Sequence, residues 1–212
     1  MVFKNRKEAA KLLAQKLLYL KGKELIVLAI PRGGLPLGVV ISKELNVPLD
    51  IVLIKKIGHP SNKEYAIGAV TLKNRVLGFG AEMVSNYYIE SETLKIRDLL
   101  KKRQRKFYKK TKPQNLQGKT VIIVDDGIAT GNTILATIEL VYNEYPAKII
   151  VAVPVAPVLA IKKLENSPYL DKLICLEPVK TFYAVGNHYD IFNQITDDEA
   201  IYLFEEANKI IR

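Results

Sequence analysis

Residues 121–133, VIIVDDGIATGNT, join a run of apolar residues to two acids and then to a turn of small residues. The apolar run predicts a strand over 119–126 that is buried on both faces, and the residues after the turn predict a helix over 134–145. Gly127 and Gly131 indicate a tight turn between the two. A strand, turn and helix in this order are typical of α/β folds, in which ligands bind beyond the carboxyl ends of parallel strands.

The turn over 127–133 has the chemistry of a phosphate site. Backbone N–H groups are unpaired at a helix N-terminus, and the helix dipole favours an anion there. The hydroxyls of Thr130 and Thr133 add donors. Asp125 and Asp126 would repel a phosphate inside the turn, so we expect them just outside it, where they accept hydrogen bonds from vicinal hydroxyls or help to hold Mg²⁺. A phosphate beside a diol is a sugar phosphate.

The rest of the chain alternates between predicted strands and helices. Longer strands are predicted at 24–30, 48–54 and 148–156, and short ones at 66–72, 75–80 and 172–178. Helices are predicted at 3–20, at 35–45, from a cap at Ser91 to Tyr108, and at 196–212. Residues 55–65 are polar and contain Gly58 and Pro60, which predicts a loop. The pattern predicts one α/β domain over 1–212 with an open, mostly parallel, twisted sheet flanked by helices.

A second candidate phosphate loop, IPRGG at 30–34, follows the first predicted strand. Gly33 and Gly34 let the backbone approach a ligand closely, and the Arg32 guanidinium offers a fork of donors to a phosphate. Taken alone, the segment is equally well explained as a simple turn between strand and helix.

A third candidate segment begins with Lys55 and Lys56 at the end of the second long strand. The two lysines leave the end of this strand and enter a long polar segment, and Lys55 is the preferred candidate because it lies nearer the strand end, with Lys56 as second choice. His59 is a candidate catalytic acid, although a lone histidine in a loop is more often a solvated surface residue.

These segments together resemble type I phosphoribosyltransferases. The run from the strand through Asp-Asp-Gly-x-Ala-Thr-Gly-x-Thr is similar to that family's signature for 5-phosphoribosyl 1-pyrophosphate (PRPP), and IPRGG looks like its pyrophosphate loop, which implies an unusual cis peptide next to Arg32. EYAIGAV (64–70) and FYAVG (182–186) resemble a subgroup of unassigned acceptor. The resemblance implies a core over about 20–160 and a small hood from 178–212 and the N-terminal helix.

The resemblance also implies the roles of individual residues. The catalytic group would be Asp125, Asp126, Arg32 and Lys55. The 5-phosphate would lie on Gly127, Ile128, Ala129, Thr130, Gly131 and Thr133. Pyrophosphate would lie on Pro31, Arg32, Gly33, Gly34, Lys55 and Lys56. Mg²⁺ would be held through PRPP and water, with Asp125 and Asp126 as candidate ligands, and a loop at 57–65 would close over the reacting centre. A homodimer is also implied.

The charge is concentrated in one segment. Of a net charge of +10, residues 101–112 supply eight positive charges and no acid, so the rest of the chain carries only two. This basic segment is either a solvated helix face or part of a field that attracts a polyanion such as PRPP. The alternative function is a PRPP- or nucleotide-sensing regulator that binds RNA or DNA, although no recognised nucleic-acid module is visible.

Composition excludes several other classes. With 49% hydrophobic and 25% charged residues the chain is typical of a globular protein, and no apolar run approaches the roughly 20 residues of a membrane span. Cys175 is the single cysteine, which excludes an internal disulfide. Residues 1–13 lack the features of a signal peptide, so a cytoplasmic location is expected. The overall prediction is transfer of a phosphoribosyl group from PRPP to a nitrogen acceptor, a nucleobase, with release of pyrophosphate.

Overall fold

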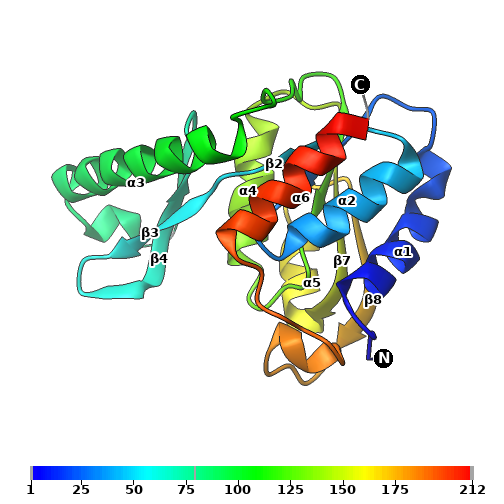
Figure 1. Ribbon diagram of the computed structural model, residues 1–212. Helices are drawn as coiled ribbons and strands as arrows, with labels where there is room; N and C mark the ends of the chain where they lie inside the picture. Colours follow the sequence, from blue (N-terminus) through cyan, green and yellow to red (C-terminus); the bar gives the residue numbers. More distant parts are fainter. Residues whose placement is uncertain (1, 79, 211–212) are drawn as a thin grey trace.

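A five-strand parallel sheet forms the body of the protein in a computed structural model that describes residues 2–78 and 80–210 (Figure 1). Phe79, Ile211 and Arg212, which fall within predicted elements, lie outside the described residues. The strands are β1 (Leu25–Ala29), β2 (Leu49–Ile51), β6 (Thr120–Val124), β7 (Lys148–Pro157) and β8 (Lys172–Val179). Their order is β2-β1-β6-β7-β8, and every neighbouring pair is parallel. The predicted fold class is confirmed.

Helices cover both faces of this sheet because alternate strand residues point to opposite sides. On one face, α1 (Arg6–Leu17), α2 (Gly34–Leu45) and α6 (Asp197–Ile210) bury their apolar residues in a core that includes Val27 and Ala29. On the other face, α4 (Asn132–Tyr142) and α5 (Val158–Glu165) pack in a core that includes Ile26 and Leu28. The strands at the centre are therefore apolar on both sides, as the continuous hydrophobic runs predict.

The order of the strands places β1 beside β6 in the centre of the sheet. From β1 the chain crosses through α2 to β2 on one side, whereas from β6 it crosses through α4 to β7 on the other side. The loops that leave the carboxyl ends of β1 and β6 therefore diverge. This divergence is the topological switch point at which open α/β sheets bind ligands.

An arm extends from the body beyond β2 (Figure 1). It consists of an antiparallel sheet of β3 (Lys55–His59), β4 (Asn62–Val70) and β5 (Arg75–Leu77), together with α3 (Asn86–Phe107). The predicted loop at 55–65 is therefore wrong, since most of it forms the hairpin of β3 and β4. Ile57 and Ile67 are fully buried, so packing stabilises strands whose polar composition disfavours them.

The start of α3 also differs from the prediction. Ser85, and not Ser91, caps the helix, and its hydroxyl oxygen accepts a hydrogen bond from the backbone N–H of Tyr88 (3.3 Å). Both serines are good caps. The earlier one is used because Ile89, which precedes the predicted start, is buried against the hairpin core.

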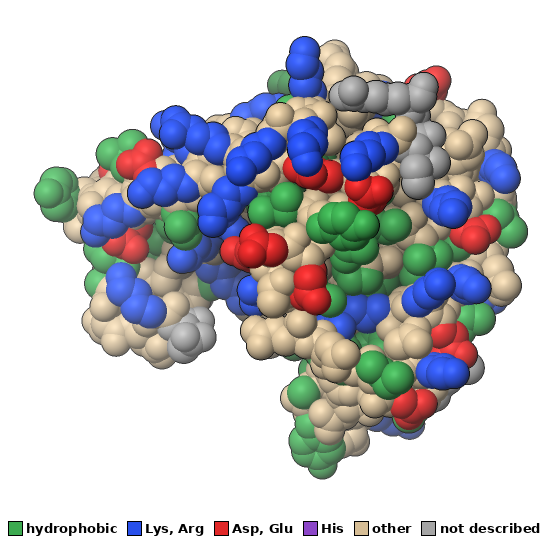
Figure 2. Space-filling model, viewed as in Figure 1, with side chains coloured by type: hydrophobic (Ala, Val, Ile, Leu, Met, Phe, Trp, Pro, Cys, Tyr) green, Lys and Arg blue, Asp and Glu red, His purple; other side chains and the backbone are tan. Residues whose placement is uncertain are grey.

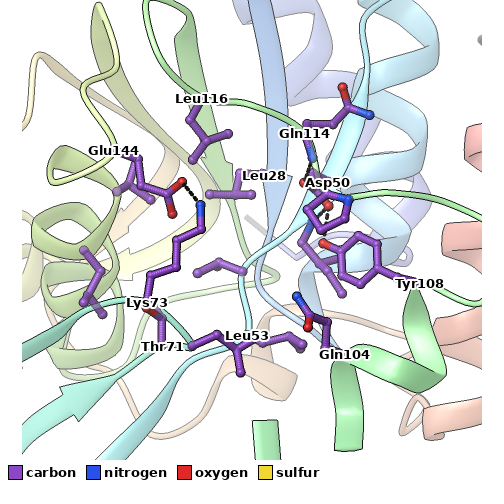
Figure 3. A pocket seen from close by; sticks show the side chains of 16 residues that line it. Leu28, Asp50, Leu53, Thr71, Lys73, Gln104, Tyr108, Gln114, Leu116 and Glu144 are labelled. Carbon is purple, nitrogen blue, oxygen red and sulfur yellow. Dashed lines mark hydrogen bonds and ion pairs between the residues drawn. The ribbon is translucent and has the colours of Figure 1, made fainter. Parts of the chain in front are cut away.

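A small cavity of ≈ 100 Å³ marks the joint between body and arm (Figure 3). Asp50 of β2 is buried there and accepts hydrogen bonds from the hydroxyl of Tyr108 and from the backbone N–H groups of Gln114 (2.7 Å) and Ile51 (2.8 Å). These bonds hold the segment that follows α3 against the edge of the sheet. Across the cavity, Lys73 pairs with Glu144 (2.7 Å).

Short 3₁₀ helices complete the fold at η1 (Leu18–Leu20), η2 (Ala81–Met83) and η3 (Val185–His188). The sequence did not predict η3 or α5. Near η3 the N-terminal segment pairs with Tyr189 through a parallel bridge at Phe3. Within the described residues no helix is long and apolar enough to cross a membrane. The division into a core and a hood stays a prediction, and the structure places α1 and α6 on one face of the sheet.

Candidate active site

The carboxyl end of β6 carries the acidic pair Asp125 and Asp126, and the turn to α4 follows directly. Ile128 anchors this turn, because its side chain is buried in the core and its backbone N–H donates to the carbonyl oxygen of Val155 (2.9 Å). Gly131 has a φ of +77°, which glycine adopts without strain, and it caps α4.

The turn after β6 leaves its backbone available to a ligand. Ala129 and Thr130 are exposed, while Thr133 is partly buried in the first turn of α4. The helix begins at Asn132 and not at 134, so two residues of the predicted turn already lie in the helix. The turn therefore leads with two exposed residues, Ala129 and Thr130, into the positive end of an eleven-residue helix, and such a helix end favours an anion.

Glycines let the loop after β1 touch the end of β6. A Cβ atom on Gly33 would lie 2.2 Å from Oδ2 of Asp126, and one on Gly34 would lie 2.5 Å from the carbonyl oxygen of Val124. Both distances are too short for real atoms, so the two loops meet only because these residues lack side chains. The peptide bond between Pro31 and Arg32 is cis, as the resemblance implied.

Arg6 of α1 holds Asp126 in place. Its Nε and Nη2 lie 2.9 and 2.8 Å from Oδ2 of Asp126, and both side chains are largely buried, at 10% and 14% exposed. The guanidinium also donates to the carbonyl oxygen of Asn193 (2.8 Å) and lies 3.8 Å from the ring centre of Phe192. The hydroxyl of Tyr189 donates to the carbonyl oxygen of Asp126 (2.6 Å). The second acid is thus fixed by side chains from both ends of the sequence.

The loops after β1 and β6 border a cleft of ≈ 700 Å³. It is lined by Arg6, Pro31, Arg32, Gly33, Arg103, Asp125, Asp126, Phe192, Gln194, Ile195 and Asp197. Five of these residues were predicted as site residues: Pro31, Arg32, Gly33, Asp125 and Asp126. The others come from α1, from α3 and from the stretch leading into α6, and their approach to the cleft depends on tertiary structure.

The pKa values of both Asp125 and Asp126 are raised above their usual range. Burial raises the pKa of Asp125 well above its usual value, and the neighbouring carboxylate of Asp126 raises it further. Burial also raises the pKa of Asp126, but the Arg6 guanidinium opposes that rise. A buried carboxyl group such as Asp125, next to a carboxylate that pairs with an arginine, is typical of a functional site.

Lys55 and Lys56 do not line this cleft; both are exposed at the start of β3. The two lysines border a hollow of ≈ 320 Å³ together with Lys63 and Lys95, and Lys56 also borders a second hollow of ≈ 340 Å³ beside Asn132 at the start of α4. Lysine and arginine side chains gather over α3 and in the recess between arm and body (Figure 2). His59 lies in the hairpin, where its Nδ1 accepts a hydrogen bond from the N–H of Ser61 (3.2 Å).

The fold and this site define a class, namely α/β proteins with a candidate ligand site at the switch point of a parallel sheet. The model of the phosphoribosyl transferase domain family matches residues 2–185. The chain therefore belongs to the phosphoribosyl transferase domain family.

Two relatives support this assignment. A protein of Mycobacterium tuberculosis (strain H37Rv), whose name assigns it provisionally to the phosphoribosyl transferases, is 32% identical over 213 residues, which cover 98% of this chain and 47% of that protein. The chain thus spans about half the length of this curated relative. The crystal structure of TT1426 from Thermus thermophilus is 34% identical and superposes with a TM-score of 0.87 over 97% of this chain and 99% of that one.

A more distant structure shares the fold alone. A hypoxanthine phosphoribosyltransferase from Staphylococcus aureus is 11% identical, with a TM-score of 0.51 over 84% of this chain and 76% of that chain. At this identity the likeness does not identify the acceptor of the present protein.

Proposed function

We propose that this protein is a phosphoribosyltransferase that takes PRPP as donor, transfers its phosphoribosyl group to a nitrogen of a nucleobase, and releases pyrophosphate. The observation that carries the proposal is the meeting of the two loops at the switch point. There Arg32 and the acidic pair Asp125 and Asp126 line one cleft, and the turn that follows Asp126 leads into the N-terminus of α4. The loop with Arg32 suits a diphosphate, the two carboxylates suit a diol, and the turn before α4 suits a phosphate monoester.

The 5-phosphate is assigned to the turn from Gly127 to Thr133. The amides of Ala129, Thr130 and Gly131 would donate to the phosphate oxygens, and the threonine hydroxyls would add further donors. The buried side chain of Ile128 supports this role, because it keeps the turn in shape without a ligand.

Pyrophosphate is assigned to the loop of Pro31, Arg32, Gly33 and Gly34, with Lys55 and Lys56 contributing from the arm. Arg32 lines the cleft, whereas the two lysines border hollows outside it. The lysines would reach the ligand through their long flexible side chains.

The ribose hydroxyls are assigned to Asp125 and Asp126. Oδ1 of Asp125 accepts a hydrogen bond from the backbone N–H of Asp126 (2.9 Å), and Arg6 binds only Oδ2 of Asp126. Both carboxylates line the cleft, and Arg6 orients that of Asp126.

Mg²⁺ fits this site only as a partner of the substrate. Among the described residues, no group of three or more His, Cys, Asp and Glu side chains is placed to hold a metal ion. One oxygen each of Asp125 and Asp126, with water and PRPP oxygens, would complete a coordination sphere of the kind that Mg²⁺ prefers. When bound, the ion would supply charge neutralisation for the leaving pyrophosphate.

The chemistry needs the protein to stabilise separated charge. As the bond from C1 of ribose to the pyrophosphate oxygen breaks, the ring gains positive charge and pyrophosphate leaves with the bonding electrons, as in glycoside cleavage. Arg32 would stabilise the leaving group, while the buried acids would hold the ribose for attack by the acceptor nitrogen. The hairpin of β3 and β4 is proposed to shield the reaction from water.

Calorimetry of PRPP binding in the presence of MgCl₂ tests the proposal. The wild type is expected to bind. The Asp125→Asn variant and the Asp125→Asn/Asp126→Asn variant are expected to lose about 100-fold or more in affinity, because hydrogen bonds to charged groups contribute about 1.5–3 kcal/mol each. A matched control, Asp98→Asn/Asp190→Asn, removes the same charge at residues that do not line the cleft. Absence of wild-type binding at millimolar PRPP would refute the proposal.

If PRPP binds, release of pyrophosphate with a panel of nucleobases identifies the acceptor. Size-exclusion chromatography with light scattering tests the proposed homodimer, and a cytoplasmic location remains part of the proposal. Strong salt-dependent RNA binding without pyrophosphate release would favour the regulator. Parts of the basic segment already have intramolecular partners, since Arg103 pairs with Asp197 and Lys110 with Glu205.

A further inference from the structure

One carboxylate in the cleft is shared by two arginines from different parts of the chain. Oδ1 of Asp197, the first residue of α6, lies 3.6 Å from Nη1 of Arg32 and 3.3 Å from Nη2 of Arg103. Arg32 belongs to the loop after β1, whereas Arg103 belongs to α3 in the arm. All three side chains line the same cleft as the acidic pair.

The geometry of this cluster is loose. Arginine and carboxylate groups in a strong pair make two parallel hydrogen bonds at about 2.7–2.9 Å, but here one oxygen serves both guanidiniums at longer distances. In the same cleft, two nitrogens of Arg6 also share one oxygen, Oδ2 of Asp126, but at the shorter distances of 2.8 and 2.9 Å. Arg32 and Arg103 therefore keep most of their donors available, and Asp197 neutralises only part of their charge.

We propose that Asp197 is an internal counter-ion for a pyrophosphate subsite, and that Arg103 is a second pyrophosphate-binding residue beside Arg32. This inference rests on the proposed function. Pyrophosphate carries more charge than one carboxylate and offers several oxygens to two guanidinium forks, so it replaces Asp197 between the arginines. Arg103 thereby contributes part of the basic segment at 101–112 to donor binding.

Asp197 can leave the arginines without loss of its helix. The side chain is 45% exposed, so it can turn to water. The end of α6 is capped independently: Glu199 accepts hydrogen bonds from the backbone N–H and the hydroxyl of Thr196, and the Thr196 hydroxyl accepts one from the backbone N–H of Glu199. This reciprocal pair is a capping box, which satisfies the helix end whatever Asp197 binds.

The competing explanation is a structural tether, in which Asp197 only ties α3 to α6 and Arg103 has no ligand. The two explanations predict opposite results for Asp197→Asn. Removal of a competing carboxylate strengthens pyrophosphate binding, whereas loss of a tether that positions the arginines weakens it or leaves it unchanged.

The test is calorimetry of inorganic pyrophosphate, with MgCl₂ at fixed ionic strength, on the wild type and three variants. Arg103→Gln is expected to lower the affinity about 10-fold or more, and Asp197→Asn is expected to raise it several-fold. Arg105→Gln is the matched control, because it removes the same charge two residues away on α3 at an exposed position that does not line the cleft. It is expected to stay within about two-fold of wild type.

Ribose 5-phosphate serves as a second probe in the same experiment. It carries no pyrophosphate, so all variants are expected to bind it within about two-fold of wild type, which also shows that they are folded. The inference is overturned if Arg103→Gln matches Arg105→Gln, or if Asp197→Asn does not strengthen pyrophosphate binding. Failure of the wild type to bind ribose 5-phosphate, pyrophosphate and PRPP would instead refute the proposed function itself.

Discussion

The cleft and the arm both carry many charged side chains, but they hold them in different ways. In the cleft, Arg6 and Asp126 are buried and joined by two short contacts, with Asp126 just beyond the carboxyl end of β6 and Arg6 at the start of α1. In the arm, Lys63 and Lys95 are 60% and 70% exposed and pair with Glu92 at the surface. A buried ion pair holds its two side chains in one geometry. An exposed ion pair does so only weakly and contributes little to stability.

This difference separates two tasks of the molecule. In the proposed reaction the cleft stabilises developing charge, which requires groups that are already in position before the substrate binds. The lysines of the arm are proposed to attract the anionic donor through a positive field, which does not require fixed side-chain positions.

The largest effect is expected at the joint between arm and body. Phe204 of α6 is fully buried, and its ring packs edge-on against Phe107 (6.0 Å between centres) and Tyr108 (5.4 Å) at the end of α3. Phe204→Ala is expected to lower the free energy of unfolding by about 3–5 kcal/mol, because it leaves a cavity in the core. Urea denaturation measures this loss. Tyr202→Ala, at an exposed position on the same helix, is the control; a loss as small as the control's would show that the arm is not packed into the core.

The next effect concerns the contact between the two loops of the cleft. Gly33→Ala would place a Cβ atom against Asp126, which cannot yield because Arg6 holds it. PRPP affinity is expected to fall about 100-fold, or about 2.7 kcal/mol, because the acid is displaced. Gly78→Ala in the arm is the matched control, since its nearest neighbour outside the adjacent residues would be 4.0 Å away. Equal affinities by calorimetry would mean that the cleft tolerates displacement of Asp126.

A smaller effect is expected from pH at the joint. Burial raises the pKa of Asp50 to about 6, although its hydrogen bonds with Tyr108, Gln114 and Ile51 oppose the rise. The folded protein thus holds this proton more tightly than the unfolded chain. The contribution of Asp50 to stability is complete below about pH 4 and is lost as the pH rises through about 6.

Asp50→Asn provides the measurement, because an amide does not titrate. The difference in unfolding free energy, wild type minus variant, is expected to fall by about 1 kcal/mol between pH 5 and pH 6. Parallel urea titrations at the two pH values give this difference. A difference that is constant or grows with pH would contradict the assignment.

The smallest effect is expected on the surface of the arm. Lys95→Ala removes an exposed pair with Glu92 (3.0 Å) one turn away on α3. The free energy of unfolding is expected to change by less than about 0.5 kcal/mol, and high salt should abolish the change. Thermal melts at low and high NaCl check this. A large, salt-resistant loss would remove the contrast between arm and cleft.

The parts of the fold that the sequence predicts are those with strong local signals. The buried strands β1, β6 and β7 are continuous apolar runs, and the turns that follow β1 and β6 are marked by glycines and by residues with a clear chemical role. Three of the predicted site residues, Arg32, Asp125 and Asp126, line one cleft.

The parts that were missed depend on long-range contacts. The hairpin of β3 and β4 has a polar sequence and a register that shifts near Gly58, so neither alternation nor propensity reveals it. Helix α5 begins at Val158, directly after the long apolar run that includes β7. Because the apolar residues continue past Pro157, the change from strand to helix periodicity is hard to recognise. Arg6 lies 120 residues from Asp126, and no local pattern links two such positions.

The order of the parallel sheet has a consequence for solubility. Its two outer strands, β2 and β8, are the places where a sheet can recruit a strand from another molecule and begin to aggregate. Strand β2 has only three residues, too few to template a long partner. Strand β8 has eight, but it begins with Lys172 and contains Pro178, which has no N–H to donate. Both edges of the sheet thus have features that oppose the addition of a strand from another molecule: β2 is short, and β8 carries a charged residue and a proline.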